Sequence, residues 1–194
     1  MPDQQTYEGT DTVVLDDELA CHDVLPVVWR PQDPPDPFQQ AGLDDNNLQL
    51  LQACVAVEEY PQPRDTGEEL GPLAAELARL DFKLNLTLQL LGQLVNREAL
   101  PPAGEVTFNS VGATWVPRQS LSTAIPGSSG ILRIQLRSSL PQLLELPAQI
   151  VSVKPAEAKV RFTHVSQPVA ELLQRLAFLR HRRSVAEGRK SRGL

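Results

Sequence analysis

The sequence is poor in aromatic residues, has two cysteines and contains no long apolar run. An aromatic fraction of 5% offers few platforms for base stacking, so nucleic acid is an unlikely partner. Cys21 and Cys54 stand in separate segments, which argues against a disulfide framework or a zinc site. No apolar run approaches the roughly 18 residues of a membrane span, and the first residues lack a basic leader-like region. We therefore expect a cytoplasmic protein without a membrane span.

Groups of catalytic or metal-ligating residues are also lacking. The three histidines, His22, His164 and His181, have no second ligand at metal-site spacing. No ordered set of nucleophile, base and orienting acid falls on expected strand ends. We predict no catalytic residue, no metal and no cofactor, and hence a protein that is not an enzyme.

Charge is distributed unevenly along the chain. Residues 1–60 contain 13 acids and the single base Arg30, a net charge of −12, whereas residues 180–194 have a net charge of +5. Solvated termini would account for this pattern. Alternatively, the basic end of the chain binds an acidic surface or an anionic ligand.

The first half of the chain predicts a strand region followed by two helices. Residues 8–31 contain one or two short strands, and four prolines within residues 30–37 indicate a turn or linker. Asp44 or Asp45 can cap a first helix that ends near Glu59 and places Leu48, Leu51 and Val55 on one face. A second helix is expected over residues 72–97. Together they form a helical insertion over residues 44–97.

The second half predicts a sheet and a closing helix. Short alternating segments between residues 104 and 166 indicate a small antiparallel barrel. In residues 130–137, for example, Leu132, Ile134 and Leu136 alternate with polar residues. Residues 167–183 read as a closing helix with an apolar stripe, and residues 184–194 as a basic tail that frays. The whole chain, residues 1–194, is expected to form one α+β domain.

Leucines recur in the second helix with the period of a coiled coil. Three leucines occupy heptad position a and three more, with one threonine, occupy position d, in the order Leu73, Leu77, Leu80, Leu84, Thr87, Leu91 and Leu94. A repeat of 3.5 residues over more than three heptads is typical of helices that pack knobs into holes. This helix is therefore expected to assemble several copies into a homo-oligomer.

The flanking positions of this helix leave the number of strands open. Leu88 lies at position e, Leu90 at position g, and Phe82 and Leu86 extend the apolar surface further round the helix. A larger bundle would hide this surface, as would a dimer seam covered by the first helix. The orientation of the helices is also left open.

Several segments resemble atypical PilZ domains. The resemblance rests on Leu25-Pro-Val-Val-Trp29, Lys83-Leu-Asn-Leu86 with Leu90-Leu91, Phe108-Asn-Ser-Val-Gly112 and Val160-Arg-Phe162. Together they look like the tetrameric PilZ proteins of xanthomonads and related bacteria. The resemblance implies a six-stranded β-barrel, two long helices inserted after the first strand, and a tetramer held by a parallel four-stranded coiled coil.

PilZ domains usually bind cyclic di-GMP, through an Arg-x-x-x-Arg segment and an Asp/Asn-x-Ser-x-x-Gly strand. This sequence has no two arginines four positions apart ahead of Val106, and only Ser110 and Gly112 carry over from the second motif. Arginines elsewhere could instead contact an anion, namely Arg118, Arg133, Arg137, Arg180, Arg182 and Arg183.

Three functions follow from this resemblance and from the charge pattern. The leading hypothesis is a non-catalytic adaptor in bacterial cyclic di-GMP signalling, acting in motility or virulence through an unknown protein partner. The alternative is a cyclic di-GMP receptor that uses the arginines outside the usual motif. Nucleic-acid binding through the basic tail is the third, and the acidic net charge of −6 disfavours it.

Overall fold

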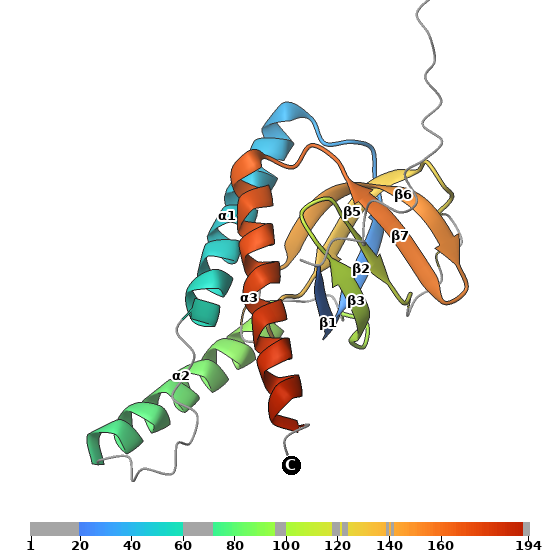
Figure 1. Ribbon diagram of the computed structural model, residues 1–194. Helices are drawn as coiled ribbons and strands as arrows, with labels where there is room; N and C mark the ends of the chain where they lie inside the picture. Colours follow the sequence, from blue (N-terminus) through green and yellow to red (C-terminus); the bar gives the residue numbers. More distant parts are fainter. Residues whose placement is uncertain are drawn as a thin grey trace, which may run out of the picture.

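In the computed structural model, one curled antiparallel sheet packs against two helices while a third helix extends outward (Figure 1). The structure describes residues 20–59, 72–95, 100–117, 121, 124–138, 140 and 142–191. Side chains are described for much of α2 between Glu76 and Leu91, and for α3 up to Val185 with the exception of residue 184.

The sheet contains seven strands, which corrects the expected six. The apolar run from Leu25 to Trp29 is divided by Pro26 into β1 (Cys21–Leu25) and β2 (Val27–Pro31). Proline lacks the N–H that a continuous ladder would need. Because β1 pairs with β3 and β2 pairs with β5, the break allows neighbouring segments to occupy opposite ends of the strand order. The sheet is therefore curled into a half-barrel.

The remaining strands lie between residues 104 and 162. They are β3 (Gly104–Phe108), β4 (Gly112–Trp115), β5 (Ser129–Ile134), β6 (Leu144–Lys154) and β7 (Glu157–Phe162). All pairs are antiparallel, in the order β1-β3-β4-β7-β6-β5-β2. Alternation fixes which side chains face inward: Leu132, Ile134, Val160 and Phe162 are buried, as the sequence pattern predicts.

Gly130 shows how tightly β2 and β5 approach each other. A Cβ atom at this position would lie 2.4 Å from the carbonyl oxygen of Arg30 and 2.5 Å from the Trp29 ring. No side chain fits there without moving the backbone. The contact therefore requires glycine.

Helix α1 (Pro37–Glu59) begins seven residues before Asp44, which corrects the expected start at Asp44 or Asp45. Asp36 caps it, because its Oδ1 accepts hydrogen bonds from the N–H groups of Phe38 (2.9 Å) and Gln39 (2.8 Å). Pro37 fits the first turn, where its missing N–H costs nothing. The helix buries Leu50, Leu51, Cys54 and Val55 against the sheet and α3.

A buried amide fixes α1 to the sheet. The Asn47 side chain donates to the Glu145 carbonyl oxygen (2.7 Å) and accepts from the Glu145 N–H (3.0 Å). Asn47 is almost fully buried, so water cannot replace these bonds.

We expect Asn47→Ala to lower the free energy of unfolding by about 2 kcal/mol, because two buried backbone groups of Glu145 lose their partner. Thermal unfolding should show a decrease in Tm of about 4–8 °C. Asn46→Ala is the matched control, since the Asn46 side chain is exposed. Equal Tm values for the two variants would contradict the conclusion that the Asn47 side chain fixes α1 to the sheet.

Helix α3 (Gln167–Ser191) covers one side of the sheet beside α1 (Figure 1). Val169, Leu173, Leu176 and Ala177 form its buried stripe. The helix continues past the expected end at residue 183, so most of the predicted basic tail is helical.

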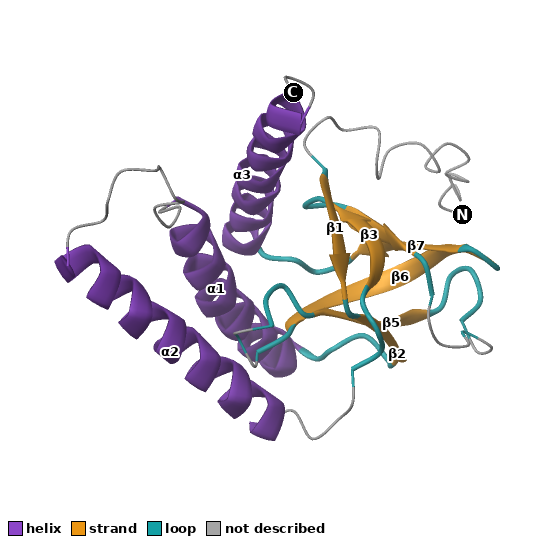
Figure 2. Cartoon of the chain, turned by 90° about the horizontal axis from the view of Figure 1, so that it is seen from below, coloured by secondary structure: helices purple, strands orange, loops and turns teal. Residues whose placement is uncertain are grey.

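Helix α2 (Pro72–Val95) lies apart from this body. Figure 2 shows it on the far side of α1 from the sheet. Within the described ranges, none of the helices combines the length and apolarity needed to cross a membrane.

Candidate functional site

The apolar face of α2 is exposed in the single chain. Leu77, Leu80, Leu84 and Leu91 of the predicted seam are each 50–59% exposed. An isolated helix gains little stability in water, and an exposed apolar stripe of this length typically marks an interaction site. The seam is therefore the strongest candidate for an assembly surface in the described chain.

Thr87 is the polar member of the seam. Its hydroxyl donates to the Lys83 carbonyl oxygen (2.9 Å), so it can enter an apolar layer without leaving an unpaired donor. The side chains of Leu73 and Leu94, the end members, lie outside the described residues.

A second set of apolar side chains lies on another side of α2. Phe82, Leu86 and Leu90 follow each other at intervals of four residues and are all exposed. This spacing places them along one stripe. The exposed apolar surface thus extends beyond the seam itself.

Helix α1 does not cover this surface with its own apolar side. That side is occupied by the sheet and α3. Within the described residues, α2 therefore exposes its apolar face, whereas α1 buries the side that contains Leu51 and Val55.

The predicted ligand residues lie at the turn between β3 and β4: Ser110 is in the turn, and Gly112 is the first residue of β4. Asn109 organises this turn, because its Oδ1 accepts from the N–H groups of Val111 (2.8 Å) and Gly112 (3.0 Å). The Ser110 hydroxyl accepts from Gln174 Nε2 of α3 (3.1 Å). The turn therefore has a structural role, since it joins β3 to β4 and contacts α3.

Arg133 lies in an open groove of about 340 Å³ between β2, β5 and the first turns of α1. Arg30 contributes a second guanidinium, and Gly42 lines the opposite wall. Glu145 faces Arg133 directly across the β5–β6 ladder, and Arg133 Nε lies 2.6 Å from Glu145 Oε1. This carboxylate reduces the attraction that the groove exerts on an anion.

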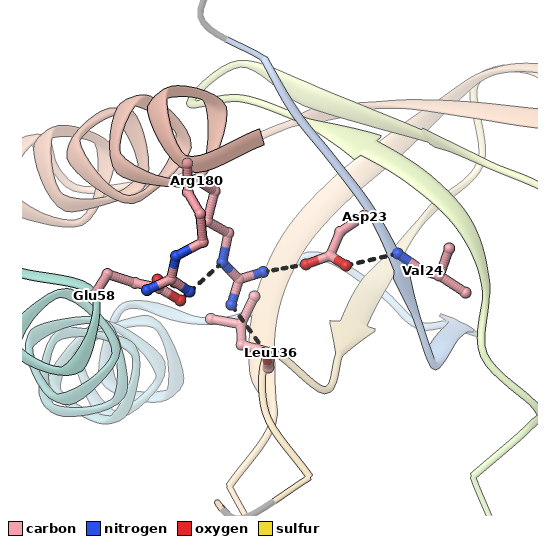
Figure 3. A network of polar contacts seen from close by, with 6 residues as sticks. Asp23, Val24, Glu58, Leu136 and Arg180 are labelled. Carbon is pink, nitrogen blue, oxygen red and sulfur yellow. Dashed lines mark hydrogen bonds and ion pairs between the residues drawn. The ribbon is translucent and has the colours of Figure 1, made fainter. Parts of the chain in front are cut away.

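Arg180 is the centre of a polar network that joins β1, α1 and α3 (Figure 3). Its guanidinium donates to Asp23 Oδ2 (2.6 Å) and to the Leu136 carbonyl oxygen (3.0 Å), and lies 3.6 Å from Glu58. Arg183 adds a contact of 2.6 Å to Glu58. The side chains of Arg180 and Glu58 are only 11% and 5% exposed. Both arginines thus already contact carboxylates.

Two groups of arginines are present in the described residues. Arg30 and Arg133 line the groove, whereas half-buried Arg137 follows Leu136 and acts, like Arg180, on the Cys54 thiol. Arg182 is exposed on α3, and Arg118 lies outside the described residues.

A family model for the atypical PilZ domain, described as a cyclic di-GMP receptor, matches residues 51–190. The chain belongs to this family. The match includes α2, the Asn109–Gly112 turn and nearly all of α3, whereas Asp23, Arg30 and the first turns of α1 precede it.

A solved structure from Xanthomonas campestris resembles this PilZ chain. It is 28% identical, covers 91% of this chain and 95% of its own, and superimposes with a TM-score of 0.63. That pathogenic protein is described as a new tetrameric PilZ domain, self-assembled via an unusual helical bundle. A comparison with curated proteins gave no match.

The buried thiols of the PilZ chain adjoin the Arg180 network. Burial raises the pKa of Cys21 to about 11, although Arg180 favours the thiolate. Burial also raises the pKa of Cys54, again against the influence of Arg180. Both cysteines are free and fully buried. They should therefore remain protonated and unreactive at neutral pH.

Sequence reasoning about the PilZ chain missed Asn109, Asp23 and Glu58. Asn109 carried a usable signal, since an Asn side chain can accept from the backbone N–H two residues on and so favours a turn. Asp23 and Glu58 carried no local sequence signal, because their partner Arg180 lies far away in the sequence.

Proposed function

We propose that this PilZ protein is a non-catalytic, cytoplasmic signalling adaptor that assembles as a homotetramer through α2. The exposed leucine seam of α2 carries the proposal. The Xanthomonas campestris protein, described as a tetramer held by a helical bundle, supports it. Two free, buried cysteines are consistent with a reducing compartment.

The proposed role lies in bacterial cyclic di-GMP pathways that govern motility or virulence, through contact with a protein partner. The family description as a cyclic di-GMP receptor supports the pathway. The description of the similar structure as a pathogenic protein supports virulence.

The oligomer is tested by light scattering on the intact protein. A homotetramer should have four times the chain mass of 21.4 kDa. A monomer at micromolar concentration would contradict the proposed assembly.

We expect cyclic di-GMP to bind weakly or not at all. The sequence lacks the usual arginine pair, and Arg133, Arg180 and Arg183 already contact carboxylates. A charge-assisted hydrogen bond contributes roughly 1.5–3 kcal/mol, so two missing arginine forks should weaken binding by about 100-fold or more. Titration calorimetry measures this directly.

A Kd below about 1 μM would instead favour the alternative, a receptor that uses non-standard arginines. Arg133→Met and Arg137→Met would then be compared with Arg182→Met. Loss of binding in the first two variants alone would place the ligand on the sheet.

A further inference from the structure

The outward side of α3 is not purely polar. Phe178 and Val185 lie two turns apart on the side opposite the buried stripe, and are 47% and 41% exposed. Arg182 lies between them and is exposed as well. Within the described residues, this combination of apolar and cationic side chains is left open to solvent.

The start of β1 lies close to this face. Cys21 pairs with Phe108, so the chain enters the sheet beside the Asn109–Gly112 turn. Ser110 of that turn is hydrogen-bonded to Gln174, one helical turn before Phe178. Ala20 is almost fully buried. The segment that precedes Ala20 therefore begins within reach of the outer face of α3.

The sequence of that segment complements α3. Residues 1–19 contain six acids and no base, and the apolar triplet Val13-Val14-Leu15 is followed by Asp16-Asp17-Glu18. Residues 180–194, which include the second half of α3, have a net charge of +5. Residues 1–19 thus combine apolar and acidic groups, whereas the outer face of α3 combines apolar and basic groups. The two are complementary in charge.

We propose that residues 13–19 dock on the outer face of α3, with the apolar triplet against Phe178 and Val185 and the acids beside Arg182. Seven residues can span about 23 Å when extended, whereas Gln174 and Val185 are separated by about 16 Å of helix. The docked segment covers the apolar surface of Phe178 and Val185.

The proposal is tested by disulfide formation between two introduced cysteines in the full chain, Leu15→Cys and Val185→Cys. Cys21 and Cys54 are fully buried, and burial raises the pKa of both thiols, so they should not compete. The control pairs Leu15→Cys with Phe38→Cys. Phe38 is highly exposed but lies at the start of α1, away from the last turns of α3 (Figure 1).

Under mild oxidation at low salt, the Leu15–Val185 pair should form an intrachain disulfide at least about tenfold faster than the control pair, through a higher effective concentration. Two changes should reduce this advantage: high salt, and the triple substitution Asp16→Asn, Asp17→Asn and Glu18→Gln. The substitution Phe178→Ser should also reduce the rate advantage of this pair over the control pair.

Equal rates for the two pairs would overturn the proposal. Disulfides that join two chains, seen as a doubled mass without reductant, would also overturn it and assign the face to a second copy. A rate advantage that is unchanged by salt and by the charge substitutions would exclude the acidic contacts.

Discussion

Replacing Leu84 with glutamate should dissociate the oligomer. Leu84 lies at heptad position a in the middle of the seam and is 59% exposed in the single chain. In a tetramer, each chain would place one unpaired carboxylate into the same apolar layer. Burying such a charge costs several kcal/mol, and the four charges would also repel one another. Light scattering should report a mass below that of the wild type.

The fold of the Leu84→Glu chain should persist. Leucine and glutamate have similar helix propensities, and the sheet buries its own core independently of α2. Circular dichroism should therefore retain the strand signal.

Arg79→Glu is the matched control for this experiment. It introduces a carboxylate five residues away, at heptad position c outside the seam, where the side chain is 64% exposed. Its mass should equal that of the wild type. A wild-type mass for Leu84→Glu would contradict the heptad interpretation and assign the leucines to contacts within one chain.

Replacing Arg180 with methionine should strongly destabilise the fold. The substitution keeps an apolar side chain of similar length but removes the partner of Asp23 and of the Leu136 carbonyl oxygen. It also removes one of the cations beside Glu58. Breaking a largely buried charge network typically costs about 3–5 kcal/mol.

Thermal unfolding measures this effect. For a chain of this size, 3 kcal/mol corresponds to a decrease in Tm of about 6–12 °C. Arg182→Met makes the same chemical change on the outward side of α3 and should leave Tm nearly unchanged. If the two variants melt alike, the network around Arg180 does not hold β1, α1 and α3 together.

Local signals were sufficient for much of the fold. The alternation in β5 predicted the burial of Leu132 and Ile134 but not of Ile131, and Pro72 predicted the start of α2. The start of α1 also had a local signal in Asp36-Pro37, but this lay within the proline-rich linker and was not recognised. Pro26 was another such signal, since it interrupts the first strand and raises the strand number to seven.

The polar contacts of Arg180 and Asn47 could not be predicted from local sequence patterns. Asp23 and Arg180 are separated by 157 positions, and Asn47 and Glu145 by 98. A sequence pattern cannot pair residues at such distances, because their contact depends on how complete elements pack. The basic character of residues 180–183 therefore suggested an anion site, although Arg180 and Arg183 lie against carboxylates of β1 and α1.

The sequence by itself determined the periodicity of this protein: the heptad spacing in α2, the alternation in the strands and the apolar stripe of α3. These properties depend on neighbouring residues and on the fixed geometry of helix and strand. Only the tertiary structure decided which helix faces are covered and which remain exposed to solvent. Because α1 packs its apolar side against the sheet and α3, that side does not cover the leucines of α2, which are exposed in the single chain.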